Sequence, residues 1–478
     1  MSTNNEKKDR GGKALKSGIW YTVSSISVRA VLIITTPLFT RLMTTEDYGI
    51  SATFTTWFTL LNVICSLNLW YAIGRAKIDF PGKLEEFVGA IQLLAFLFTV
   101  VVGIVVFPFQ KTAIKFLELP KSLVIALFIY LLAYPGVQFT QAKFKYLYNY
   151  KGNIAITIYT TISTVLLSLF FVLVLPNNMA LGKAMGAVVS TAIFSSVVWF
   201  SSIRKKIIKI NFTYWKYALI ISVPLILNSI SLNILAQSDR IFITKFNGTH
   251  YTAIYSLAYS YAVLINIVLN AINEAWLPWF HDSLNDNMVR EIRNNVKPLV
   301  VLGGWIGIGC IALAPEAIAI LGGSAYNEGI WVVPPVTLGV FCSYVFQQYE
   351  HIELHLKKTW YISLGTIIAA GINILLNYIF VPKFGFIAAA YTTLGCYLLL
   401  MIAHNYISRV LLKKHLYDDK FMYLAIIVVS ILACIFMFLY DKIWILRWAL
   451  ISVISIIYLF VNREYIIKVT NKFKTRKK

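Results

Sequence analysis

Apolar residues occur along this chain in long runs, each about as long as a helix that crosses a membrane. Such a helix needs about 20 mostly apolar residues. The runs predict about 14 transmembrane helices, at residues 19–43, 48–70, 87–109, 122–141, 154–175, 184–203, 217–244, 251–278, 298–321, 330–349, 360–381, 386–406, 421–440 and 443–462. The segments of about ten alternating residues that indicate a membrane β-barrel do not occur. We therefore expect an all-α, polytopic membrane protein.

The composition supports this class and excludes two others. Of the 478 residues, 58% are hydrophobic and 13% are charged, and the mean hydropathy is +0.71. Soluble proteins are about 45–50% apolar and about 25% charged. A soluble domain with this composition could not cover its apolar surface, and a disordered chain needs low hydrophobicity and high charge.

The positive charge is concentrated on one side of the predicted membrane. The chain has 43 Lys and Arg against 21 Asp and Glu, a net charge of +22. Most of the basic residues lie in the N-terminal segment 1–18, the C-terminal tail and the loops predicted on that same side. Basic loops stay in the cytoplasm, so we expect both termini there. The basic runs favour anionic lipid headgroups, and no nucleic-acid partner is expected.

An internal repeat relates the first six predicted spans to the next six. Spans one and seven both end in a basic residue, and a short polar turn with Thr and Tyr follows each of them. Leu175-Pro176 and Val381-Pro382 also occupy equivalent positions. An offset of six spans gives the two halves the same orientation, as in transporters whose substrate site lies between the halves. We therefore predict two pseudo-symmetric six-helix lobes, at residues 1–209 and 210–415, and two extra C-terminal helices within 416–478.

Polar residues recur at helical spacing on spans one, two, seven and eight, the first two helices of each repeat. Such stripes are typical of helices that line an aqueous cavity, although Ser, Thr and Asn also join membrane helices to one another. The candidate residues for binding the sugar part of a substrate are Thr22, Ser25, Thr55, Thr59, Asn62, Asn233, Gln237, Tyr255, Tyr259, Asn266, Asn270 and Asn273.

Four charged residues on these spans are candidates for a functional site. Arg29 is predicted near the middle of the bilayer, where its charge costs at least about 2.5–3.5 kcal/mol. Arg240 is predicted in the outer half of span seven. Both in one cavity would bind phosphate or pyrophosphate, which guanidinium groups bind bidentately, although a structural ion pair is an alternative role for Arg29. Asp239 and Glu274 are candidates for ion coupling, since a carboxylate that moves between water and a buried site can carry a proton.

Motifs for catalysis, nucleotide binding or metal binding are absent from the sequence, so an enzyme or an ATP-driven pump is not expected. His351 and His355 flank Glu353 without forming the H-E-x-x-H motif. The five cysteines lie in apolar stretches without paired spacing. We expect no cofactor and no metal site, and H⁺ or Na⁺ as the coupling ion.

Several short segments resemble the Wzx-type polysaccharide flippases of the multidrug/oligosaccharidyl-lipid/polysaccharide exporter superfamily. They include the opening Lys16 to Trp20, the turn from Arg41 to Gly49, Ser238 to Ile243 in span seven, and the turn from Pro382 to Ala390. The resemblance covers about residues 15–460. It implies two six-helix lobes that alternate access to a cationic cavity, in which Arg29 and Arg240 match the arginines of the family.

The resemblance also implies a function. The cargo of this family is an undecaprenyl-pyrophosphate-linked oligosaccharide repeat unit of O-antigen, capsule or exopolysaccharide, flipped across the cytoplasmic membrane and often coupled to an ion gradient. Polysaccharide polymerase machinery is an implied partner. The alternatives are a peptidoglycan lipid-precursor flippase, a cation-coupled multidrug antiporter, which would require a mid-membrane acidic site, and a scaffold that recruits polymerising enzymes.

Overall fold

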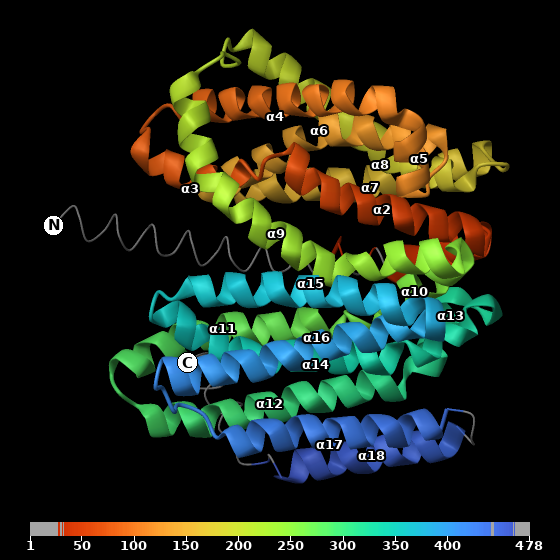
Figure 1. Ribbon diagram of the computed structural model, residues 1–478, viewed down its shortest axis with the longest axis vertical. Coiled ribbons are helices and arrows are strands. Elements are labelled where there is room, and N and C mark those ends of the chain that lie inside the picture. The colour runs from red at the N-terminus through yellow and green to blue at the C-terminus, as the bar shows by residue number, and fades with distance from the viewer. Residues whose placement is uncertain (1–26, 29–30, 32, 441–443, 462, 464–478) are drawn as a thin grey trace, which may run out of the picture. The chain divides into compact units, whose positions relative to one another are not determined.

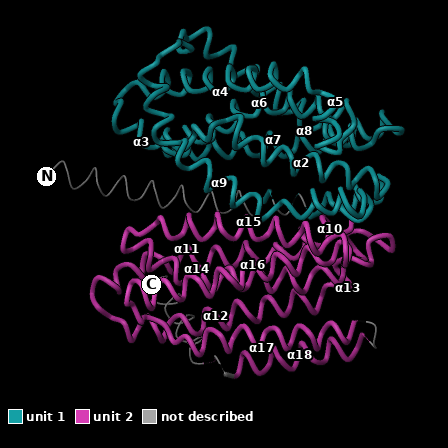
Figure 2. Tube along the Cα trace, in the orientation of Figure 1, with its two compact units in different colours: residues 1–253 teal, residues 254–478 magenta. Residues whose placement is uncertain are grey.

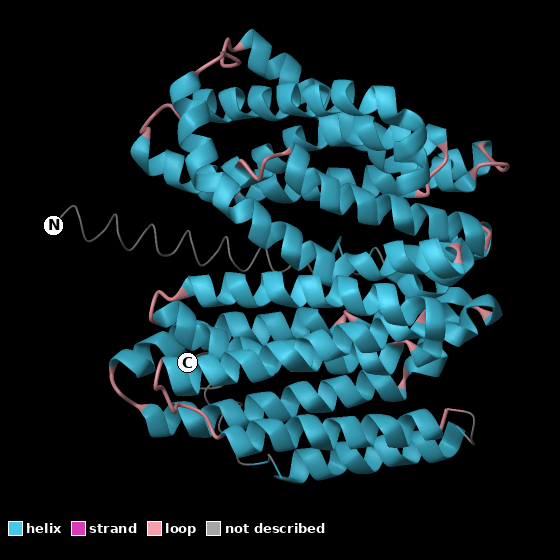
Figure 3. Cartoon of the chain, viewed as in Figure 1, coloured by secondary structure: helices cyan, strands magenta, loops and turns pink. Residues whose placement is uncertain are grey.

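The computed structural model describes residues 27–28, 31, 33–440, 444–461 and 463 (Figure 1). Throughout these residues the chain is built of helices joined by short loops, and it contains no strand (Figure 3). The all-α class predicted from the sequence is confirmed. The first predicted span, 19–43, lies partly outside the described residues, and residues 33–42 of it are helical.

The chain divides into two compact units, Met1–Ala253 and Ile254–Lys478 (Figure 2). Helix α9 belongs to the first unit, because it packs against α2, α3 and α4. The boundary between the units therefore lies after α9, whereas the predicted lobes divide before it, at residue 209. The lobe boundaries stay a prediction.

The first unit contains long helices that run side by side. Its helices are α2 (Thr45–Cys65), α3 (Trp70–Asp79), α4 (Leu84–Val106), α5 (Gln110–Leu117), α6 (Lys121–Tyr146), α7 (Tyr150–Val174), α8 (Met179–Arg204) and α9 (Phe212–Asn247), with the short 3-10 turn η1 (Phe107–Phe109) between α4 and α5. Helix α10 (Thr249–Ala262) begins in this unit and continues into the second.

The second unit has the same kind of architecture. Its helices are α11 (Ile265–Asn285), α12 (Val289–Ala312), α13 (Ala314–Gly322), α14 (Val333–His355), α15 (Thr359–Phe384), α16 (Ile387–Tyr406), α17 (Asp419–Phe438) and α18 (Trp444–Val461), with the 3-10 helix η2 (Ser324–Trp331) before α14 and the π-helical turn η3 (Ile407–Leu411) after α16. Helices α17 and α18 both pack against α12, at the edge of the unit (Figure 1).

The described residues contain 11 helices long and apolar enough to cross a membrane, or 12 if the bent pair of η2 and α14 is one span. The bend within this pair is 46°. The other two of the 14 predicted spans are the partly described first one and α18, which has 18 residues. The chain is therefore a multi-pass membrane protein.

Two of the spans are interrupted, and they occupy equivalent positions in the sequence repeat. The second predicted span breaks between α2 and α3, where Leu67 and Asn68 have φ angles of 50° and 51°. The eighth predicted span breaks between α10 and α11. At the first break the hydroxyl of Thr99 donates to the carbonyl oxygen of Cys65 at 3.3 Å, which satisfies one backbone group that the break frees. The break follows 21 helical residues of α2 in the first case and 14 of α10 in the second.

Helices α2 and α9 approach closely in the first unit. Gly49 on α2 faces the start of α10, and a Cβ atom placed there would overlap the carbonyl oxygen of Thr249. One turn further along α2, the hydroxyl oxygens of Thr53 and Thr244 lie 2.8 Å apart, and Thr244 is also 2.8 Å from Thr252. Small residues and shared hydroxyl bonds are the usual means by which membrane helices pack closely.

Gly49→Ala should therefore destabilise the protein. The added methyl group meets backbone atoms that cannot rotate away, and overpacking of this kind costs about 1–3 kcal/mol. We expect a lower melting temperature of the purified protein in detergent. The control is Gly371→Ala on α15, where an added Cβ atom has no neighbour within 4 Å. Equal melting temperatures for the two variants would contradict the close packing of α2.

Candidate transport site

Three predicted site residues, Thr22, Ser25 and Arg29, lie outside the described residues. The remaining predicted residues fall on α2 and α9 in the first unit and on α10 and α11 in the second. Their roles stay predictions, and the structure shows how each side chain is placed within its own unit.

The predicted residues of α2 differ in exposure and bonding. Thr55 is exposed and Thr59 is half-buried, and each hydroxyl donates to a carbonyl oxygen of the preceding turn at 2.9 Å. These bonds leave the oxygen lone pairs available as acceptors. Asn62 is buried, and its carbonyl oxygen has no hydrogen-bond partner among the described residues. An unsatisfied amide oxygen in an apolar helix bundle is costly and is typical of a site that receives water or a ligand.

Helix α9 carries the buried charges of the first unit. Asp239 is fully buried and Arg240 is 6% exposed. One guanidinium nitrogen of Arg240 donates to the carbonyl oxygen of Ala236 at 3.2 Å. Asn233 lies about two turns before these charges and Gln237 less than one turn before them, and both are half-buried. Charged side chains at such depth are rare in membrane helices and mark functional sites.

A further cation, Lys183 on α8, lies in the first unit near the start of α2. Its ammonium nitrogen is 3.8 Å from the ring centre of Tyr48 and 5.2 Å from that of Phe39. A desolvated cation over two aromatic faces gains on the order of 2 kcal/mol. The sequence places Lys183 in an outer loop and does not distinguish it from a solvated lysine, because only the fold brings the rings together.

In the second unit, the predicted residues are partly buried and partly exposed. Tyr255 and Tyr259 are buried, and their rings stack with centres 5.8 Å apart. Asn270 and Glu274 are exposed on α11, and Asn266 is half-buried. The exposed groups on α11 can contact water or a ligand.

Asn273 on α11 takes part in a buried amide network. Its amide nitrogen donates to the carbonyl oxygen of Gln347, and its carbonyl oxygen accepts from Gln348 at 2.9 Å. The Gln348 amide also donates to the backbone of Tyr344 at 3.2 Å, and Tyr417 donates to the backbone of Gln348 at 3.1 Å. This network holds α11 against α14.

A second amide network, not predicted from the sequence, lies between α15 and α16. Asn373 and Asn377 are fully buried, and the amide of Asn377 donates to the carbonyl oxygen of Asn373 at 3.1 Å. Asn373 donates to the hydroxyl of Thr393 at 3.1 Å, and Thr392 bonds to Asn377. The i,i+4 spacing of the two asparagines is the sequence signal for this network, since it places both amides on one face of the helix.

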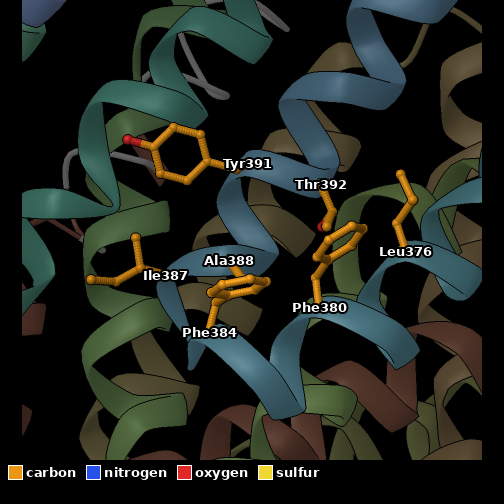
Figure 4. Close-up of a pocket in the computed structure, with 7 residues that line it drawn as sticks. All are labelled: Leu376, Phe380, Phe384, Ile387, Ala388, Tyr391 and Thr392. Carbon is orange, nitrogen blue, oxygen red and sulfur yellow. The ribbon is translucent and has the colours of Figure 1, made fainter.

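A pocket of about 530 Å³ opens between the adjacent ends of α15 and α16 (Figure 4). Its lining is mostly aromatic and aliphatic, and Thr392 supplies a hydroxyl. The lining residues are Leu376, Phe380, Phe384, Ile387, Ala388, Tyr391 and Thr392. In Figure 4 the Tyr391 ring points away from Phe380 and Leu376, toward a neighbouring helix. A pocket with so few polar groups suits an acyl or isoprenoid chain better than a sugar.

Among the described residues, no group of three or more His, Cys, Asp or Glu side chains is arranged to hold a metal ion. The five cysteines are free thiols, and four of them are buried.

The arrangement of the helices is that of a class of membrane transporters. The structure is similar to that of the lipid II flippase MurJ in an inward closed conformation, with a TM-score of 0.68, 14% sequence identity, and coverage of 94% of this chain and 100% of that one. It is also similar to an inward-facing multidrug resistance MATE family transporter of the MOP superfamily, with a TM-score of 0.61, 12% identity, and coverage of 86% and 98%. At these identities the likeness shows the fold alone.

The family follows from the sequence itself. Residues 14–284, more than half of the chain, match the family described as "Polysaccharide biosynthesis protein", so the chain belongs to this family. A relative is Lsg locus protein 1 of Haemophilus influenzae, which is 24% identical over 285 residues, or 57% of this chain and 67% of that protein. The resemblance stated from the sequence is confirmed.

Asn273 and Asn270 lie on the same helix, and only the amide of Asn273 belongs to a hydrogen-bond network. Variants of the two residues therefore test whether the network stabilises the protein. Asn273→Ala should destabilise the protein by about 1–3 kcal/mol, because it removes the hydrogen-bond partner of the buried Gln348 amide and of the half-buried Gln347 amide. Asn270→Ala should leave the melting temperature unchanged, since Asn270 is exposed. Thermal unfolding in detergent measures both effects, and an Asn273→Ala protein as stable as Asn270→Ala would contradict the network.

Proposed function

We propose that this protein is a flippase for undecaprenyl-pyrophosphate-linked oligosaccharide repeat units. It moves them from the cytoplasmic to the outer leaflet of the bacterial inner membrane by alternating access. The family supports a role in polysaccharide biosynthesis, and the fold supports transport. The cargo belongs to an O-antigen, capsule or exopolysaccharide pathway. The protein is not an enzyme and needs no cofactor, and both of its termini are cytoplasmic.

The observation that carries this proposal is the burial of Arg240 within a membrane-crossing helix. Arg240 is 6% exposed on α9, a helix of 36 residues. Charged side chains inside membrane helices mark substrate and ion pathways. The pyrophosphate of a lipid-linked sugar is an anion that a guanidinium binds bidentately. In this proposal Arg29 supplies the second cation.

The candidate sugar-binding residues that the structure describes lie on α2 and α9 in the first unit and on α10 and α11 in the second. The hydroxyl of Thr55 and the amide of Asn270 are exposed, and Asn62 has an unsatisfied carbonyl oxygen. Hydroxyl and amide groups can each both donate to and accept from sugar hydroxyls. The lipid tail would stay in the bilayer, and a polysaccharide polymerase would act on the product.

A gradient of H⁺ or Na⁺ would drive the cycle. Asp239 and Glu274 are the carboxylates that the sequence nominates for coupling. Asp239 is fully buried, whereas Glu274 is exposed. A carboxylate couples proton binding to a conformational change when it is dry in one state and hydrated in another. Asp239 is dry in the state described here, so it fits this role better than Glu274.

A flippase for a peptidoglycan lipid precursor is the second candidate, and it is favoured by the likeness to the lipid II flippase MurJ. Rescue of a strain that lacks lipid II flipping would support this candidate over the first. A cation-coupled drug antiporter is favoured only by the likeness to a MATE family transporter, which shows the fold alone.

Replacement of either arginine should abolish most transport. Truncation of one partner of a buried, hydrogen-bonded charge pair costs about 2–5 kcal/mol, so Arg29→Ala and Arg240→Ala should each lower the rate of repeat-unit export about tenfold or more. Arg240→Lys should keep part of the rate, because it retains the charge and loses the bidentate geometry. Surface polysaccharide, quantified at equal protein levels, measures the export.

The matched control is Arg290→Ala, which removes an exposed arginine near the start of α12 and should leave export unchanged. Normal export by Arg29→Ala or Arg240→Ala at normal protein level would contradict the pyrophosphate site.

A further inference from the structure

Two carboxylates flank a single histidine inside the second unit. Nδ1 of His404 on α16 lies 2.7 Å from a carboxylate oxygen of Glu353, and its Nε2 lies 3.7 Å from a carboxylate oxygen of Glu350. Glu350 and Glu353 are on the last turns of α14, three residues apart, so both point from one face of the helix. The ring of Phe346 stacks on His404 with centres 5.5 Å apart.

This cluster is shielded from water. The side chains of His404 and Glu353 have no exposed surface, and that of Glu350 is 20% exposed. The second carboxylate oxygen of Glu353 and Nε2 of His404 are buried and have no hydrogen-bond partner among the described residues. Glu350 is therefore the one member of the cluster through which water can reach it.

The charges of the cluster do not balance unless it holds an additional proton. An imidazolium at His404 neutralises one carboxylate, and the other carboxylate would then be a buried, uncompensated charge, which is expensive. Two carboxylates sharing one site do not both stay ionised when the site is dry. With His404 as an imidazolium, the cluster becomes neutral when one carboxylate carries a proton, and hydration of the site lets that proton leave.

No neighbouring basic residue on α16 or α17 among the described residues pairs with the uncompensated carboxylate of the cluster. Arg409, just after α16, pairs at 3.2 Å with Asp419 of α17. Asp419 also accepts hydrogen bonds from Tyr349 and Asn405, at 2.9 and 2.8 Å.

In the part of the chain that the structure describes, no basic side chain on the other helices that pack against α14 pairs with this carboxylate either. Lys297 of α12 pairs with Asp418 at 2.7 Å, and Arg293 of α12 donates to the backbone of residues 415 and 416. His281 of α11 contacts His355 on another face of α14, 3.0 Å between ring nitrogens. Lys357 and Lys358 are exposed.

The backbone beside the cluster is suited to movement. The π-helical turn η3 begins three residues after His404, and such turns occur frequently at functional sites. Gly365 on α15 lies against the free ring nitrogen, where an added Cβ atom would be 3.3 Å from Nε2. The histidine is thus held between a helix end that can change its winding and a residue without a side chain.

We propose that Glu350, Glu353 and His404 form a second proton-binding site, in addition to Asp239, and that the proton gradient drives the transport cycle only when this cluster is intact. This inference rests on the proposed flippase function. A proton from the outer side of the membrane binds to a carboxylate oxygen of the cluster as the site closes and dries. When the site opens to the cytoplasm through Glu350, water receives the proton and the carboxylate returns to its ionised form.

The test uses the purified full-length protein in liposomes of anionic and neutral phospholipid. The probe is a fluorescent undecaprenyl-pyrophosphate-linked disaccharide in the outer leaflet, and its movement inward is measured as protection from a membrane-impermeant quencher. The readout is the ratio of the rate with an acidic lumen to the rate at equal pH. We expect about fivefold or more for the wild type and about one for Glu350→Gln and His404→Gln.

Two further variants separate coupling from structure. Glu350→Asp keeps the carboxylate and should restore most of the ratio. Glu291→Gln removes an exposed carboxylate on α12 and should keep the full ratio. A merely structural role for the cluster predicts a lower melting temperature with an unchanged ratio, and that result would overturn the proposal.

If a variant does not fold, a measurement on the wild type alone tests whether probe movement is coupled to proton movement. A pH-sensitive dye in the lumen should report at least about one proton leaving for each probe molecule moved. Probe movement without proton movement overturns the proton site and leaves the flippase function intact. No probe movement under any gradient overturns both proposals.

Discussion

The lack of water in the hydrocarbon of the membrane is the constraint on which the rest of this structure depends. Every polar group in a span must be satisfied by the protein or belong to a site that receives water or a ligand. Most of them are satisfied locally: the hydroxyls of Thr55 and Thr59 bond to their own helix, and Asn373 bonds to Asn377 and Thr393. Charged groups are buried on α9 and between α14 and α16 as well, and buried charges in membrane helices mark functional sites.

The interruptions in the helices connect this constraint to movement. The second and eighth predicted spans are both broken, between α2 and α3 and between α10 and α11. Irregular backbone is tolerated at membrane depth only where protein or water covers it, and transporters place their substrate sites beside such breaks. The polar residues of α2 and α11 lie on these two interrupted spans, so the sugar-binding residues proposed here flank backbone that can change its conformation.

The sequence is sufficient for the fold class, the placement of the spans and the family, because each depends on long apolar runs or short local motifs. It also identifies Arg240 and Asp239, since a charge inside an apolar run is visible without a structure. The role of His404 is not visible, because its partners Glu350 and Glu353 are some 50 positions away in the chain and only the packing of α14 on α16 joins them. The cation–π contact of Lys183 is missed for the same reason. The predicted stripes mix two kinds of residue that periodicity cannot separate, the bonded amide of Asn273 and the exposed amide of Asn270.

The most direct test of the central claim is whether the purified protein alone moves a lipid-linked oligosaccharide between leaflets. Liposomes with and without the protein would carry a labelled undecaprenyl-pyrophosphate-linked oligosaccharide, and the fraction accessible to a membrane-impermeant quencher would be followed over time. The account predicts that the label redistributes between the leaflets only in liposomes that contain the protein, and faster than a labelled phospholipid does. Equal redistribution in empty liposomes, or equal movement of the phospholipid, would contradict it.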